Sequence, residues 1–159
     1  MMYYKLPISK LTIFSLIFVL PFTFTGCAEE SEEIIPNTYV NFTIRLDDPQ
    51  FIGLNTIGSA VIVTRSYDGS NSAGYDNNGI IIYRASEDEF YAFDRTCTYN
   101  VKLSAAIEIE DSGITAKCPE CGSRYVFPSL GFPTEDGPSK NPLRQYSTHF
   151  DGTTVHVYN

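Results

Sequence analysis

Short runs in which apolar and polar residues alternate dominate the chain after residue 37. Residues 39–46 read YVNFTIRL, with an apolar side chain at every second position, which is typical of a strand with one buried face. Residues 60–64 read AVIVT, a buried apolar run. Further strand-like runs are GIIIYRA (79–85), EFYAF (89–93), SAAIEIE (104–110), GITAKC (113–118) and SRYVF (123–127).

The chain ends in a predicted hairpin. LRQYSTHF (143–150) and TTVHVYN (153–159) flank Asp151-Gly152, a dipeptide that favours a tight turn between antiparallel strands. No window has a sustained helical period, and residues 66–79 are rich in turn formers and are predicted to be a loop or hairpin. The fold class is therefore all-β, a small sandwich or barrel of short antiparallel strands.

The N-terminus differs from the rest of the chain. Lys5 and Lys10 precede the apolar run LTIFSLIFVLPFTFT, which ends at Gly26 and Cys27. A basic segment before a short apolar segment is typical of a secretory signal peptide, and FTGC is similar to a bacterial lipobox, whose cysteine is acylated. We therefore expect residues 1–26 to be a lipoprotein signal and Cys27 to carry a lipid. The expected location is the cell envelope, as an outer-membrane lipoprotein on the periplasmic face or the cell surface.

Charge narrows the choice of partners. The chain has 11 Lys and Arg against 19 Asp and Glu, and removal of residues 1–26 leaves a net charge near −10. Such a charge argues against nucleic acid as a partner, since phosphate contacts need Lys and Arg. The acidic residues 27–36 are predicted to be a solvated tether, and 37–159 a single domain. Contact with the membrane is expected through the lipid alone.

Three cysteines remain in the predicted domain: Cys97, Cys118 and Cys121. An odd number in an exported chain does not suit a purely disulfide framework. Cys118 and Cys121 are spaced C-x-x-C, but a thioredoxin-like dithiol would start a helix, whereas Gly122 and a strand-like run follow here. Pro119 and Gly122 suit the tight turn that metal-binding C-x-x-C pairs use.

The segment from residue 79 onward resembles the Rieske iron–sulfur domain, in which two loops carry the cluster ligands and a Gly-Pro-rich third loop covers them. The matching stretches are GIIIYRASEDEFYAFDRTCTYN, GITAKCPECGSRYVF and GPSKNPL. The resemblance implies ligand loops at 94–100 and 117–123 and a third loop at 137–143. It implies metal ligation by Cys97 and Cys118, with Gly122 and Ser123 beside the sulfur atoms.

The two histidine positions of the family pattern have changed, one to Tyr99 and the other to Cys121. Three outcomes are open. Cys97, Cys118, Cys121 and Tyr99 could hold a [2Fe–2S] cluster of lowered potential, because anionic ligands replace neutral imidazoles.

The same thiols could instead bind zinc or another metal, with Asp94 or water as the fourth ligand. In the third outcome no metal is bound, and a disulfide from Cys97 to Cys118 or Cys121 joins the loops. His149 and His156 lie in the last hairpin and are expected to be surface or packing residues.

No nucleophile–base pair, carboxylate dyad or phosphate-binding glycine loop stands out in the sequence. We therefore expect an electron carrier, which exchanges electrons with a redox or envelope protein, and not an enzyme. The alternative is a structural or binding lipoprotein without a cluster.

Overall fold

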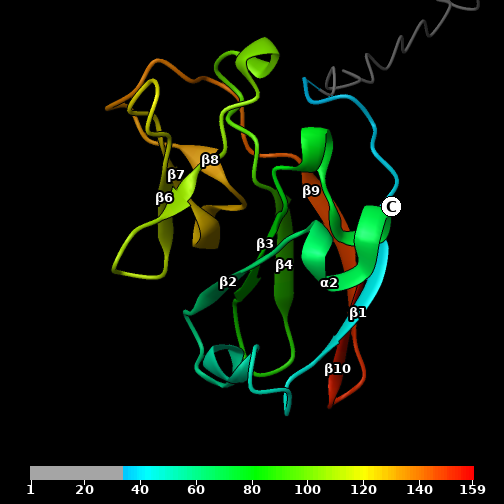
Figure 1. Ribbon diagram of the computed structural model, residues 1–159. Coiled ribbons are helices and arrows are strands. Elements are labelled where there is room, and N and C mark those ends of the chain that lie inside the picture. Colours follow the sequence, from blue (N-terminus) through cyan, green and yellow to red (C-terminus); the bar gives the residue numbers. More distant parts are fainter. Residues whose placement is uncertain (1–33) are drawn as a thin grey trace, which may run out of the picture. The chain divides into compact units, whose positions relative to one another are not determined.

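The computed structural model describes residues 34–159, which belong to one packed unit (Figure 1). The predicted signal peptide, the lipid site at Cys27 and most of the predicted tether lie outside the described residues. Within residues 34–159, none of the helices combines the length and the hydropathy that crossing a bilayer would require.

Two antiparallel sheets make up the fold, so the predicted all-β class is confirmed. The larger sheet has six strands in the order β1-β10-β9-β4-β3-β2, and the smaller has four in the order β5-β6-β7-β8. The strands of the larger sheet are β1 (Asn41–Arg45), β2 (Ala60–Val63), β3 (Ile80–Arg84), β4 (Phe90–Asp94), β9 (Gln145–Phe150) and β10 (Thr154–Tyr158). Those of the smaller sheet are β5 (Glu108–Ile109), β6 (Thr115–Lys117), β7 (Arg124–Val126) and β8 (Phe132–Pro133).

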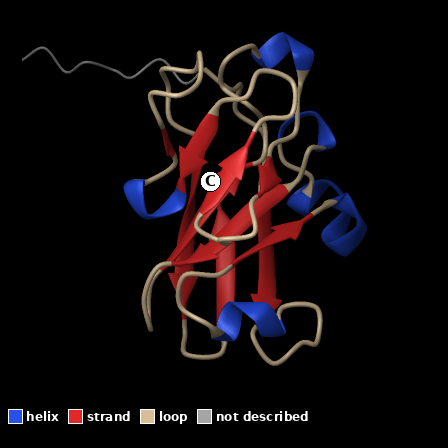
Figure 2. Ribbon diagram, turned by 90° about the vertical axis from the view of Figure 1, so that its left-hand side faces the viewer, coloured by secondary structure: helices blue, strands red, loops and turns tan. Residues whose placement is uncertain are grey.

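Helical elements are short and lie in the connections between strands, as Figure 2 shows. They are α2 (Arg65–Asp68) and the 3₁₀ turns η1 (Ile52–Asn55), η2 (Gly69–Ser72), η3 (Tyr75–Asn77), η4 (Val101–Leu103) and η5 (Phe127–Ser129). The segment 66–79, predicted to be a loop or hairpin, thus folds into consecutive helical turns. The predicted strand at 104–110 is also shorter than expected, because only Glu108 and Ile109 pair with β6.

Strand β3 is buried on both faces, which explains its unbroken apolar run. Ile80 and Ile82 belong to one core, with residues of β1, β9 and β10, whereas Ile81 and Tyr83 belong to a second core with residues of the smaller sheet. All four side chains are at most 4% exposed. A strand that contributes to two cores has no face left for polar residues.

The second core also holds cysteines. Cys97 and Cys118 are grouped there with Phe93, Tyr125 and Phe127, and the half-buried Cys121 packs against this core. The two sheets therefore bring together the two segments that the sequence analysis singled out.

The domain begins slightly before residue 37. Ile35 is 1% exposed, and Arg144 Nη1 donates a hydrogen bond to the Ile35 carbonyl (2.9 Å). At least the last part of the segment predicted to be tether is therefore packed against the domain.

Candidate metal centre

The first site loop leaves β4 after Asp94 and is fixed by buried hydrogen bonds. The Asp94 carboxylate is fully buried and accepts from Thr96 N (2.9 Å), Tyr75 N (2.7 Å) and the Tyr146 hydroxyl (2.7 Å). The Arg95 side chain donates to the Ile107 carbonyl (2.7 Å). Asp94 is occupied in this way and is not among the residues that group with the cysteines, so it does not supply the fourth metal ligand considered above.

The second site loop is a tight turn between β6 and β7. Gly122 N donates to the Cys118 carbonyl (3.0 Å), and Cys118 N donates to the Ser123 carbonyl (2.9 Å). Gly122 has a φ of +78°, a conformation that favours glycine. The C-x-x-C-Gly order thus folds locally so that both thiols lie on the turn.

The Sγ atoms of Cys97, Cys118 and Cys121 all lie within 4.8 Å of one another. Cys97 Sγ is 3.6 Å from Cys121 Sγ. Cys97 and Cys118 are 2% and 1% exposed, and Cys121 is half-buried, so the cluster reaches the surface on the Cys121 side. The three residues are free thiols. Three sulfur atoms at this separation can bind one metal ion once their protons are lost.

The histidines lie elsewhere. His149 and His156 face each other across β9 and β10, and His156 Nε2 is hydrogen bonded to Asn41 Oδ1 (2.8 Å). Neither belongs to the thiol group, in agreement with their expected surface role.

Hydroxyl groups contact two of the sulfur atoms. Ser123 is fully buried, and its Oγ lies 3.2 Å from Cys121 Sγ. The Tyr125 hydroxyl lies 3.3 Å from Cys97 Sγ and also accepts a hydrogen bond from Thr98 N (3.1 Å). The sequence analysis placed Ser123 beside the sulfur atoms but missed Tyr125. The available signal was its position two residues after Ser123, on the same side of the strand.

The thiols differ in acidity because their surroundings differ. Burial raises the pKa of Cys118 to about 12, although hydrogen bonds from the backbone of Cys121 and Glu120 act in the opposite direction. At Cys121 burial also raises the pKa, but hydrogen bonds with Ser123, Cys118 and Cys97 together outweigh it, and the net effect is a lowered pKa. Cys121 is therefore easier to deprotonate than Cys118.

The third loop closes over the Ser123 side of the site. Ser139 N donates to Ser123 Oγ (3.0 Å), and Ser139 Oγ is hydrogen bonded to Thr98 Oγ1 (2.8 Å). Ser139 is 2% exposed, so this loop shields the buried hydroxyls from solvent. All three predicted loops therefore meet at one place.

Tyr99 does not share this buried setting. Its side chain is 54% exposed. A [2Fe–2S] cluster needs four ligands, two for each iron. The described residues bring only three cysteine thiols together, with no fourth cysteine, histidine or carboxylate in the group. Among the described residues, the cysteine, histidine and carboxylate side chains therefore supply three of the four ligands, and Tyr99 as the fourth stays a prediction.

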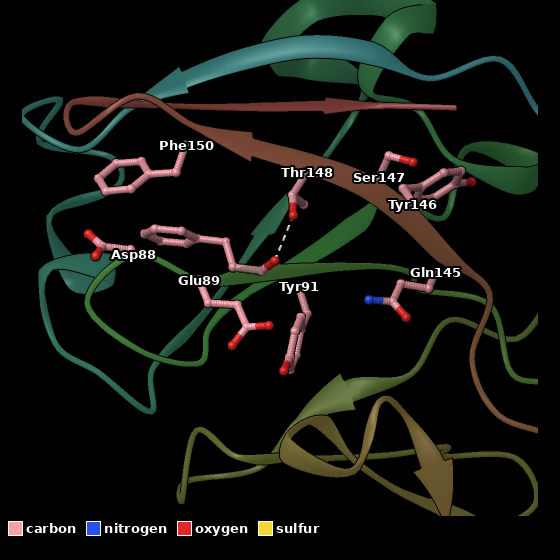
Figure 3. A pocket seen from close by; sticks show the side chains of 9 residues that line it. Asp88, Glu89, Tyr91, Gln145, Tyr146, Ser147, Thr148 and Phe150 are labelled. Carbon is pink, nitrogen blue, oxygen red and sulfur yellow. Dashed lines mark hydrogen bonds between the residues drawn. The ribbon is translucent and has the colours of Figure 1, made fainter.

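A hollow of about 540 Å³ lies between β4 and β9 (Figure 3). The two strands pair over only two positions, Ala92 with Tyr146 and Phe93 with Gln145. Beyond them Thr148 Oγ1 donates to the Phe90 carbonyl (2.7 Å), as the dashed line in Figure 3 shows. No cysteine lines this hollow, so it is separate from the thiol cluster.

No protein-family model matches the chain. No characterised protein matches its sequence. Its fold is similar to solved structures. One is the ferredoxin of carbazole 1,9a-dioxygenase from Nocardioides aromaticivorans IC177, with a TM-score of 0.46 and 21% identity over 77% of this chain and 98% of that chain.

A complex of reduced oxygenase and oxidized ferredoxin in carbazole 1,9a-dioxygenase gives a TM-score of 0.42 and 23% identity, over 65% of this chain and 82% of that chain. The structure of a putative nitrite reductase NADPH (small subunit) oxidoreductase protein gives a TM-score of 0.41 and 13% identity, over 77% of this chain and 100% of that chain.

Proposed function

We propose that this chain is a lipid-anchored envelope protein in which Cys97, Cys118 and Cys121 form a thiolate metal centre. The observation that carries the proposal is the convergence of three thiols, from two loops far apart in sequence, to within 4.8 Å. After Cys27 these three are the chain's only cysteines, and its two methionines are Met1 and Met2. Every sulfur atom of residues 28–159 therefore belongs to this one cluster.

The surroundings of the cluster support a bound metal. Burial disfavours isolated thiolates, and a cation bonded directly to the sulfur atoms removes that penalty. The Ser123 hydroxyl, 3.2 Å from Cys121 Sγ, can donate a hydrogen bond to this sulfur once its proton is lost, and the pKa of Cys121 is lowered.

A second candidate is the [2Fe–2S] electron carrier that the family resemblance implies. Hydrogen bonds to sulfur raise the potential of such clusters, and the Ser123 and Tyr125 hydroxyls are placed to supply them. A cluster would supply one-electron transfer to a redox or envelope partner. It would need Tyr99 or a ligand from outside the described residues as the fourth donor.

The metal-free alternative is a cystine. Cys97 Sγ and Cys121 Sγ lie 3.6 Å apart, within reach of a disulfide after a small movement of the side chains. Oxidation would leave Cys118 as the free thiol and would make the domain structural.

Metal and acid-labile sulfide content, measured on full-length protein purified without oxygen from its own membrane, tests the proposal. One metal ion per chain without sulfide, lost in Cys118→Ser, is the expected result. Equal iron and sulfide with visible absorption would select the [2Fe–2S] candidate. Metal-free protein with two cysteines blocked to alkylation would exclude a metal centre.

A further inference from the structure

The thiol cluster has an unusual donor set for a protein metal site. It offers three sulfur atoms, with no imidazole or carboxylate in the group among residues 34–159. Structural zinc sites are almost always four-coordinate, and carboxylate and water ligands suit harder ions. A set made only of thiolates favours a soft ion.

Access to a fourth ligand is restricted. Cys97 and Cys118 are at most 2% exposed, and only the half-buried Cys121 reaches the surface. The loop that carries Ser139 covers the neighbouring side, since Ser139 N donates to Ser123 Oγ (3.0 Å). A water ligand can therefore approach only past Cys121, which disfavours an ion that must complete a tetrahedron from solvent.

We propose that the three thiols bind one monovalent copper ion, Cu(I), in three-coordinate geometry. The inference rests on the proposed function, because it names the metal of the same centre. Cu(I) is soft, has a filled d shell and is satisfied by three sulfur ligands. On binding, three Cu–S bonds form and three S–H bonds break, and the three protons leave to solvent. Neither copper nor sulfur changes oxidation state.

The negative charge that results is met by fixed dipoles. The Ser123 hydroxyl lies 3.2 Å from Cys121 Sγ. The Tyr125 hydroxyl lies 3.3 Å from Cys97 Sγ. Two of the three sulfur atoms, those of Cys97 and Cys121, thus have a hydroxyl group within hydrogen-bonding distance, which is the outer support that metal–thiolate sites use.

The test uses the mature lipidated protein in detergent, in which the lipid is expected to block the sulfur of Cys27, so that the only free thiols are those of the cluster. Cu(I) is added without oxygen as its acetonitrile complex, in competition with a coloured Cu(I) chelator. We expect one Cu(I) per chain, ultraviolet thiolate-to-copper absorption, and three sulfur neighbours by X-ray absorption spectroscopy. Cys121→Ser should weaken binding by more than about 100-fold, beyond the 10–100-fold cost of losing an outer-shell partner.

Two controls separate the possible results. Tyr99→Phe should leave Cu(I) affinity unchanged, since Tyr99 is exposed and is not needed in a three-coordinate site. Circular dichroism of each cysteine variant shows whether it folds. If Cys121→Ser does not fold, Cys97→Ser serves as the variant that has lost a ligand.

The copper assignment would be overturned if the protein bound Cu(I) no more tightly than its Cys121→Ser variant does and bound Zn²⁺ tightly through the three thiols. The proposal of a metal centre would then still hold. Failure of reduced, folded protein to bind Cu(I), Zn²⁺ or an iron–sulfur cluster would overturn both proposals.

Discussion

At the scale of single residues, the site contains buried hydroxyl groups beside the cysteines. Tyr125 is fully buried, and burial, followed by the neighbouring Cys97, raises its pKa to about 12. It is therefore a neutral phenol near pH 7. Its hydroxyl accepts from Thr98 N and contacts Thr98 Oγ1 at 3.0 Å, so it connects β7 to the first site loop.

Tyr125→Phe should lower the free energy of unfolding of the metal-free protein by about 1–3 kcal/mol, because Thr98 N loses its buried acceptor. Urea unfolding followed by circular dichroism measures the change. Tyr158→Phe is the matched control, since Tyr158 is 39% exposed. Equal stability of the two variants would show that the Tyr125 hydroxyl contributes nothing measurable.

The sequence was enough to predict Cys97, Cys118 and Cys121 as the sulfur donors of one site, because cysteine has few roles and these three positions fall on two predicted loops. The assignment of Tyr99 as a fourth ligand stays a prediction. Sequence position placed Tyr99 next to Cys97, but its exposure of 54% follows from how the loop turns after Thr98, which no local pattern encodes.

At the scale of elements, the third loop is held by hydrogen bonds of Ser139 and also approaches Ser123 very closely at Gly137. A Cβ atom at Gly137 would lie 2.4 Å from Ser123 Cα and 2.7 Å from Ser123 Oγ. Any side chain at position 137 would therefore clash with Ser123, so only glycine fits there. The predicted Gly-Pro loop packs closely against the turn that carries Cys121.

Gly137→Ala should push the loop off Ser123, break the hydrogen bond from Ser139 N, and make Cys121 more exposed. We expect a loss of about 1–3 kcal/mol of stability, as for other overpacked sites, and faster alkylation of Cys121. Alkylation followed by mass spectrometry measures the second effect. Gly53→Ala is the control, because a Cβ there meets its nearest atom at 3.9 Å; similar alkylation rates in both variants would contradict the proposed cover.

The alternation of apolar residues predicted most strands of the larger sheet within a few residues. It failed for 66–79, where turn-forming residues do not distinguish a loop from short helical turns. It also overextended 104–110, since an apolar run is compatible with a strand whether or not a partner strand pairs with it.

At the scale of the whole molecule, strand β3 contributes side chains to both cores. It therefore packs the larger sheet against the smaller sheet, next to which the thiol cluster lies. Ile81 is fully buried on the side of the second core, which also contains Cys97 and Cys118. Packing on this face therefore positions the thiols.

Ile81→Ala should cost about 2–5 kcal/mol, as expected for a large apolar residue removed from a packed core. It should also weaken metal binding, because the cavity lies in the cysteine-bearing core. Ile82→Ala, on the opposite face, should cost a similar amount of stability but leave metal affinity nearly unchanged. Denaturant unfolding and metal titration together test this; equal effects of both variants on affinity would contradict a separate role for the second core.

The sequence by itself determined the all-β class, the strand runs, the tight turn at Gly122 and the identity of the sulfur donors. These follow from local patterns, because strand periodicity, turn geometry and side-chain chemistry act over a few residues. Only the tertiary structure decided that Cys97 lies 3.6 Å from Cys121, that Tyr125 contacts Cys97, and that the group contains three donors. Those facts depend on how two sheets pack around a shared strand, a long-range outcome that no short stretch of sequence encodes.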